Sequence, residues 1–147
     1  MIKVLIVDHQ LIFRESLKIV IERDQEIQVI GSCGDGREAY EFCGRQMPDI
    51  VLMDITMPKC DGIEGTRLIK RKYPDTKILI LTIFNEDTRV AEALRYGADG
   101  YVLKDISPDN FILAIKSVAQ GLVVIQKQVM NKITTQLEGT TTLEYVK

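Results

Sequence analysis

The sequence predicts an α/β fold, a doubly wound sheet of five parallel strands in a (βα)5 order. Short apolar runs alternate with helical patterns five times, which is typical of strands joined by crossover helices. Several of the runs are apolar at consecutive positions, as expected for parallel strands that are covered on both faces. The chain of 147 residues is long enough for one domain with a buried core.

Five β-branched or leucine-rich runs are the predicted strands. In chain order they are residues 2–7 (IKVLIV), 27–32 (IQVIGS), 49–54 (DIVLMD), 77–82 (KILILT) and 100–104 (GYVLK). The runs are short and mostly lack the polar alternation of half-exposed strands, so we expect the sheet to lie inside the molecule.

The segments between these runs have the spacing of helices. The predicted helices are residues 10–23, 35–45, 62–72, 86–97 and 107–121. The first of them places five apolar side chains near one face: Leu11, Phe13, Leu17, Val20 and Ile21.

Capping residues support the limits of three helices. Asp35 is a candidate N-cap, and Ser107-Pro108 is a cap followed by a first-turn proline. Gly97 and Gly121 stand where two helices are expected to end.

The apolar pattern weakens after residue 121 and gives way to a Thr-rich polar stretch. We therefore expect a domain over residues 1–120, and a linker or tail over 121–147. The chain has no segment long enough for a DNA-reading helix-turn-helix, so DNA binding is expected only through an output domain absent from it.

Composition narrows the class of protein. A net charge of −2 and a pI near 5.5 give no basic surface for nucleic acid. Cys33, Cys43 and Cys60 are odd in number and widely spaced, which indicates reduced thiols. The sequence shows no secretory signal, and no apolar run approaches the roughly 18 residues of a membrane helix. We expect a cytoplasmic protein with no membrane contact.

Four polar residues stand at the ends of four predicted strands: Asp8, Asp54, Thr82 and Lys104. The carboxyl ends of parallel strands form one edge of a sheet, where ligands bind. In the strand order 2-1-3-4-5 the first and third strands are neighbours, so Asp8 and Asp54 would converge, with Thr82 and Lys104 beside them.

Each of these residues alone has an ordinary structural explanation. An Asp after a strand most often forms a turn or caps a helix. Thr82 could simply end a strand, and Lys104 could be a solvated loop cation. Four such residues at one edge favour a shared site over four coincidences.

The four side chains suit a phosphoryl acceptor. Two carboxylates in one pocket repel each other unless a cation lies between them, and Mg²⁺ prefers such oxygen ligands. A carboxylate can also attack phosphorus and form an aspartyl phosphate. A lysine such as Lys104 and a hydroxyl such as that of Thr82 would then stabilise the phosphoryl oxygens.

Four stretches resemble the receiver domain of two-component response regulators, over about residues 2–120. They are VLIVDHQLIFRESL, PDIVLMDITMPKCDGIE, ILILT and ALRYGADGYVLKD. The sequences of these stretches are most similar to those of the subfamily that ends in a LuxR/NarL-type helix-turn-helix. The resemblance implies a flavodoxin-like strand order 2-1-3-4-5.

The resemblance also implies roles for individual residues. Asp54 would be the phosphoacceptor, and Lys104 would pair with the phosphoryl group. Asp8, Asp54 and the backbone carbonyl of Thr56 would hold Mg²⁺. Thr82 would be the switch hydroxyl and Tyr101 the aromatic residue that moves with it, although Tyr101 could equally be a packing residue.

Two positions depart from the family pattern. The family usually has two adjacent acids after the first strand, and ungapped alignment places His9 at the second. Imidazole is a poor Mg²⁺ ligand and suits Zn, Ni or Cu better, so we expect weaker Mg²⁺ binding. A partly exposed loop histidine is the simpler interpretation of His9. Ile83 follows Thr82 where a small residue is common, and it could restrict access of small phosphodonors or water.

The implied function is a signalling switch rather than an enzyme. A sensor histidine kinase would phosphorylate Asp54, and the altered face would control homodimerisation or a transcriptional output domain. Self-phosphorylation from small donors and autodephosphorylation would be its only reactions. One alternative is a phosphorylation-independent pseudo-receiver that binds proteins, favoured by the acid missing at His9. Another is a flavodoxin-like cofactor binder, but DHQLIF after the first strand has no phosphate-cradling glycine.

Overall fold

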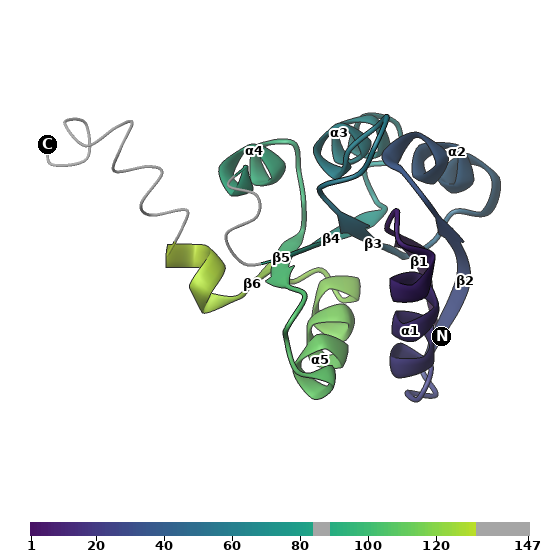
Figure 1. Cartoon of the computed structure of the whole chain (residues 1–147), viewed down its shortest axis with the longest axis vertical. Helices are drawn as coiled ribbons and strands as arrows, with labels where there is room; N and C mark the ends of the chain where they lie inside the picture. The colour runs from purple at the N-terminus through teal and green to yellow at the C-terminus, as the bar shows by residue number, and fades with distance from the viewer. Residues whose placement is uncertain (84–88, 132–147) are drawn as a thin grey trace, which may run out of the picture.

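A parallel sheet of six strands runs through the molecule in the order β2-β1-β3-β4-β5-β6 (Figure 1). This computed structural model describes residues 1–83 and 89–131. The strands are β1 (Ile2–Val7), β2 (Ile27–Cys33), β3 (Ile50–Asp54), β4 (Lys77–Thr82), β5 (Gly100–Leu103) and β6 (Val124–Ile125). The predicted doubly wound fold and its order 2-1-3-4-5 are confirmed, with one short strand added beside β5.

Helices cover both faces of the sheet (Figure 1). On one face lie α1 (Leu11–Ile21) and α5 (Pro108–Ala119), and on the other lie α2 (Gly36–Gln46), α3 (Gly62–Lys72) and α4 (Val90–Arg95). Four of the helices begin and end within a few residues of their predicted limits. The fourth was predicted to begin at residue 86, which lies outside the described residues, and its described part begins at Val90.

Two apolar layers fill the space between the sheet and the helices. Along β1, Leu5 and Val7 belong to the layer under α2, α3 and α4, whereas Val4 and Ile6 belong to the layer under α1 and α5. Successive side chains of a strand point to opposite faces, so a strand covered on both faces is apolar at every position.

One predicted core residue of the first helix is exposed. Ile21 is buried and Phe13 is half-buried, but Leu11 is 55% exposed. Two residues along an α-helix correspond to about 200° of rotation, so Leu11 and Phe13 lie on nearly opposite faces. The prediction that both line one apolar face was wrong for Leu11.

Side-chain caps begin three of the helices. The Asp35 carboxylate accepts hydrogen bonds from two backbone N–H groups in the first turn of α2, and the Ser107 hydroxyl accepts one in α5, as predicted. Asp61 does the same for α3. Gly97 and Gly121 follow α4 and α5 with φ of +102° and +100°, a conformation that glycine adopts without strain.

The sheet and core extend past the boundary expected at residue 120. β6 pairs with the first two residues of β5, and residues 127–131 are helical. Val129 in this helical segment is fully buried. Residues 132–147 of the predicted tail lie outside the described residues.

The cysteines are free thiols. Burial raises the pKa of Cys33 to about 11 and that of Cys43 to about 12, so neither is a thiolate at neutral pH. In the two described ranges, none of the helices combines the length and the apolar character needed to cross a bilayer.

Candidate functional site

Four polar side chains come together at the C-terminal edge of the sheet. Asp8 directly follows β1, Asp54 ends β3, Thr82 ends β4 and Lys104 directly follows β5. The strand register places each of them within one residue of the level of its neighbour. The backbone N–H of Lys104 also donates to the carbonyl of Thr82 at 2.7 Å, which joins the last two strand ends.

Lys104 is shared by two buried carboxylates. Its Nζ lies 2.7 Å from Oδ2 of Asp8 and 3.4 Å from Oδ2 of Asp54. The side chains of Asp8 and Asp54 are 1% and 7% exposed, so they depend on partners rather than on water. One ammonium facing two carboxylates leaves an excess of negative charge among these three groups.

The pocket changes the protonation of Asp54. Burial raises the pKa of Asp54 to about 6, the Lys104 ammonium lowers it and the neighbouring Asp8 carboxylate adds to the rise. A carboxyl group with a pKa near 6 is mostly ionised at pH 7. Asp54 can therefore act there as a nucleophile or as a metal ligand.

Three residues at the start of the first helix hold Asp8 and Lys104 in place. The backbone N–H of Gln10 donates to Oδ1 of Asp8 at 2.8 Å, and the guanidinium of Arg14 donates to the backbone carbonyl of Asp8. The Lys104 Nζ lies 4.3 Å from the centre of the Phe13 ring, a cation–π contact. Neither Phe13 nor Arg14 was predicted at the site, and the only signal for them in the sequence is that they follow Asp8 closely in the chain.

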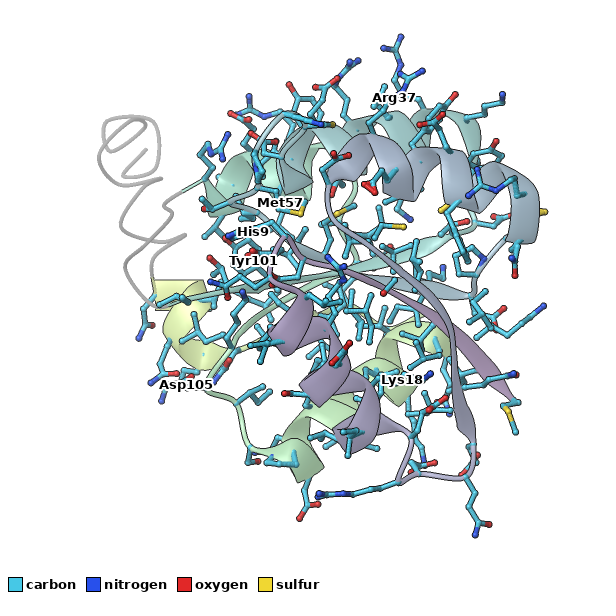
Figure 2. All side chains as sticks on the ribbon, turned by 45° about the vertical axis from the view of Figure 1, so that its right-hand side comes forward. His9, Lys18, Arg37, Met57, Tyr101 and Asp105 are labelled. Carbon is cyan, nitrogen blue, oxygen red and sulfur yellow. The ribbon has the colours of Figure 1, made fainter. Side chains whose placement is uncertain are left out.

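His9 lies at the open side of the two carboxylates. Its Nδ1 is 3.9 Å from Oδ1 of Asp8 and 3.9 Å from Oδ2 of Asp54, and its side chain is 40% exposed. One donor atom from each of the three residues falls within 4.8 Å of the others. Figure 2 shows His9 at the same end of the sheet as Met57.

These donors fit the Mg²⁺ of the family pattern only in part. The carboxylates of Asp8 and Asp54 are oxygen ligands of the kind that Mg²⁺ takes. The imidazole of His9 offers nitrogen where the pattern expects a second acid, and Mg²⁺ binds nitrogen poorly. The two carboxylates fit this metal and His9 does not.

The other predicted site residues differ in burial. Thr82 is 3% exposed, and Tyr101 is fully buried in the apolar layer that also contains Met57 (Figure 2). Thr56 lies exposed in the loop after β3, and Ile83 is 52% exposed. The structure thus brings three side chains, those of Asp8, Asp54 and Lys104, into one cluster, with Thr82 buried on the next strand.

Sequence comparison identifies relatives of this chain. Residues 4–116 match the family model of the response regulator receiver domain. The transcriptional regulatory protein LnrK of Bacillus subtilis (strain 168) is 45% identical over 125 residues, which are 85% of this chain and 57% of LnrK. The transcriptional regulatory protein DegU of Brevibacillus brevis is 39% identical over 132 residues, 90% of this chain and 56% of DegU. The chain spans little more than half the length of these relatives.

Solved structures agree with the sequence relatives. A two-component response regulator of the LuxR family from Aurantimonas sp. SI85-9A1 matches with a TM-score of 0.84 at 32% identity, covering 91% of this chain and 96% of that chain. The signal receiver domain of the response regulator NarL from Mycobacterium tuberculosis matches with a TM-score of 0.75 at 30% identity, covering 82% and 97%. The chain belongs to the response regulator receiver domain family and is similar to its LuxR/NarL-type members.

Proposed function

We propose that Asp54 accepts a phosphoryl group from a sensor histidine kinase and that this chain is the phosphoacceptor of a two-component pathway. Membership of the receiver domain family supports a signalling role of this kind. One observation carries the choice of Asp54: it is a buried carboxylate at the sheet edge, 3.4 Å from the ammonium of Lys104.

In the proposed reaction a carboxylate oxygen of Asp54 attacks phosphorus. The bond between phosphorus and the histidine nitrogen of the kinase breaks, and the electron pair leaves with that nitrogen. Lys104 would move from the carboxylate, which loses its charge, to a phosphoryl oxygen. The hydroxyl of Thr82, on the neighbouring strand end, would donate to another phosphoryl oxygen.

A divalent cation supplies further positive charge to the phosphoryl oxygens when it is bound. Asp8 and Asp54 would hold it, together with the backbone carbonyl of Thr56. Mg²⁺ is the cation that the family pattern implies, and the two carboxylates fit it.

The output is proposed to pass through Thr82 and Tyr101. Tyr101 is fully buried on the strand next to Thr82, so a movement of the hydroxyl toward the phosphoryl group would change what packs on β5. The change would control homodimerisation or an output domain of a longer protein. LnrK and DegU are named transcriptional regulatory proteins, which supports DNA binding as that output. The free thiols favour the cytoplasm.

The test is the intact mass of the chain after incubation with acetyl phosphate or phosphoramidate. The unmodified sequence is expected to gain one phosphoryl group in the presence of a divalent cation. Asp54→Asn is expected to gain none. Asp105→Asn, which removes an exposed carboxyl group beside Lys104, is the matched control and should be labelled normally.

Labelling that persists in Asp54→Asn would refute the assignment of the acceptor. The absence of any adduct would favour the pseudo-receiver, for which the imidazole of His9 is the supporting observation. In that case His9→Asp distinguishes a pseudo-receiver from a receiver whose metal pocket is defective. Labelling that returns in this variant would place the defect in the metal pocket.

A further inference from the structure

The imidazole of His9 and the carboxylates of Asp8 and Asp54 face one another. The Nδ1 atom lies 3.9 Å from a carboxylate oxygen of each acid. These distances are too long for hydrogen bonds, which end near 3.2 Å for nitrogen and oxygen. The His9 imidazole Nδ1 therefore faces both carboxylates without a hydrogen bond to either.

The spacing suits one metal ion. Zinc binds nitrogen and carboxylate oxygen at about 2.0–2.2 Å in tetrahedral sites, so two ligands of the same ion are roughly 3.4 Å apart. Both 3.9 Å distances from His9 Nδ1 are somewhat longer than that, and the donor atoms of the three residues lie within 4.8 Å of one another. Side-chain movements on the order of 1 Å would bring the three donors to the spacing of one ion.

The charges of the pocket also favour a cation. Lys104 is the one Lys or Arg side chain within ion-pair distance of the Asp8 and Asp54 carboxylates, as far as the described residues show. Arg14 contributes its charge nearby but donates to the backbone carbonyl of Asp8, not to the carboxylate. The side chain of His9 is 40% exposed, which leaves a path for an ion and room for water ligands.

The donor set decides which cation is preferred. Mg²⁺ takes oxygen and resists nitrogen, whereas imidazole suits zinc and the later first-row divalent metals. Replacing a carboxylate by imidazole therefore weakens the site for Mg²⁺ more than for Zn²⁺.

We propose that Asp8, His9 and Asp54 form a binding site for a nitrogen-accepting divalent transition ion, with His9 Nδ1 as a direct ligand and with Mg²⁺ disfavoured. This site is the same pocket as the proposed phosphoacceptor site. The inference rests on that proposed function only for what the bound ion would do there. The binding itself needs no phosphoryl group, so it is tested without one.

The imidazole nitrogens report the binding directly. His9 is the single histidine of the chain, so its two ring nitrogens give unambiguous ¹⁵N NMR signals. Zn²⁺ added to the full chain is expected to shift the Nδ1 signal to that of a metal-bound nitrogen, while Mg²⁺ leaves it in place. The experiment uses a Cys60→Ser background, because Cys60 is the cysteine that is not fully buried and could bind Zn²⁺ itself.

Calorimetry of the same background measures the preference. The ratio of the Mg²⁺ to the Zn²⁺ dissociation constant is expected to fall by about tenfold or more in His9→Asp, which restores an oxygen ligand. Asp54→Asn is expected to weaken both metals, and Asp105→Asn, on the loop beside Lys104, is expected to change neither.

Zn²⁺ that leaves both ring nitrogens unshifted would overturn the proposal, as would an unchanged metal ratio in His9→Asp. Either result is independent of the phosphorylation test. An Asp54 that is labelled with Mg²⁺ while His9 binds no metal would keep the proposed function and remove the transition-metal site.

Discussion

The residue on which the charge of the pocket depends is Lys104. Its ammonium contacts both buried carboxylates and rests against the Phe13 ring at 4.3 Å from its centre. Asp8 has the shorter contact with Lys104, 2.7 Å against 3.4 Å for Asp54, and its other carboxylate oxygen accepts the backbone N–H of Gln10. Burial raises the pKa of Asp54 to about 6, against the opposing effect of the Lys104 ammonium.

The raised pKa of Asp54 predicts how stability changes with pH. Unfolded aspartate has a pKa of about 3.9, so between about pH 4 and pH 6 the native state holds a proton that the unfolded state has lost. The free energy of unfolding therefore falls as the pH rises through this window. Asp54→Asn removes the effect and should gain about 1–3 kcal/mol relative to the unmodified chain between pH 4 and pH 7.

Urea unfolding at a series of pH values, with a chelator present to exclude metals, measures this difference. Asp105→Asn is the control and should give a curve parallel to that of the unmodified chain. Parallel curves for Asp54→Asn as well would show that Asp54 titrates alike in the native and unfolded states, contrary to the expectation.

The positions of the cluster residues follow from the sequence, but their supports do not. Asp8, Asp54 and Lys104 are predictable because parallel strands end at one edge of a sheet. The contacts of Phe13 and Arg14 depend on how α1 is rotated about its axis, which is set by packing on the sheet. The spacing of apolar residues defined that rotation too loosely, as the exposed Leu11 shows.

At the scale of elements, the junction between β3 and α3 holds Asp54 in position. The N–H of Gly62, the first residue of α3, donates to the carbonyl of Ile55 at 2.9 Å. A Cβ atom on Gly62 would lie 2.0 Å from the backbone oxygen of Asp54. Gly62 does not have a positive φ, so space rather than backbone conformation requires glycine here.

Gly62→Ala is therefore expected to push α3 away from the end of β3. The clash is with backbone, which yields less readily than a flexible side chain, so the free energy of unfolding should fall by about 2–4 kcal/mol. Gly34→Ala is the matched control, because its Cβ would meet only side-chain atoms at 3.6 Å. Its unfolding free energy should change by no more than about 0.5 kcal/mol.

Chemical denaturation of the two variants tests the close approach. Equal stabilities for Gly62→Ala and Gly34→Ala would mean that the loop after β3 adjusts freely. The sequence predicted a helix that begins at residue 62, and only the packed structure shows which backbone Gly62 touches. The caps at Asp35 and Ser107, by contrast, were predictable because they act within a single turn.

At the scale of the whole molecule, the segment after α5 completes the sheet next to the site. The backbone N–H of Gln126 donates to the carbonyl of Tyr101 at 3.1 Å, and its side-chain oxygen accepts the N–H of Leu103 at 2.8 Å. These bonds pair backbone groups of β5 just before Lys104 with Gln126. The sequence placed the domain boundary near residue 120 because a two-residue strand and a short helical segment leave almost no periodic signal.

Val129 ties this segment to the core, where it is fully buried in the layer that contains Tyr101. Val129→Ala removes two buried carbon atoms and leaves a cavity. The free energy of unfolding should therefore fall by about 1.5–3 kcal/mol. Lys127→Ala, an exposed change in the same helical segment, should alter it by less than about 0.5 kcal/mol. Denaturant unfolding of both variants gives the comparison. Equal midpoints would mean that residues after 121 only rest on a domain that is complete without them, whereas the expected loss makes them part of the fold that carries Lys104.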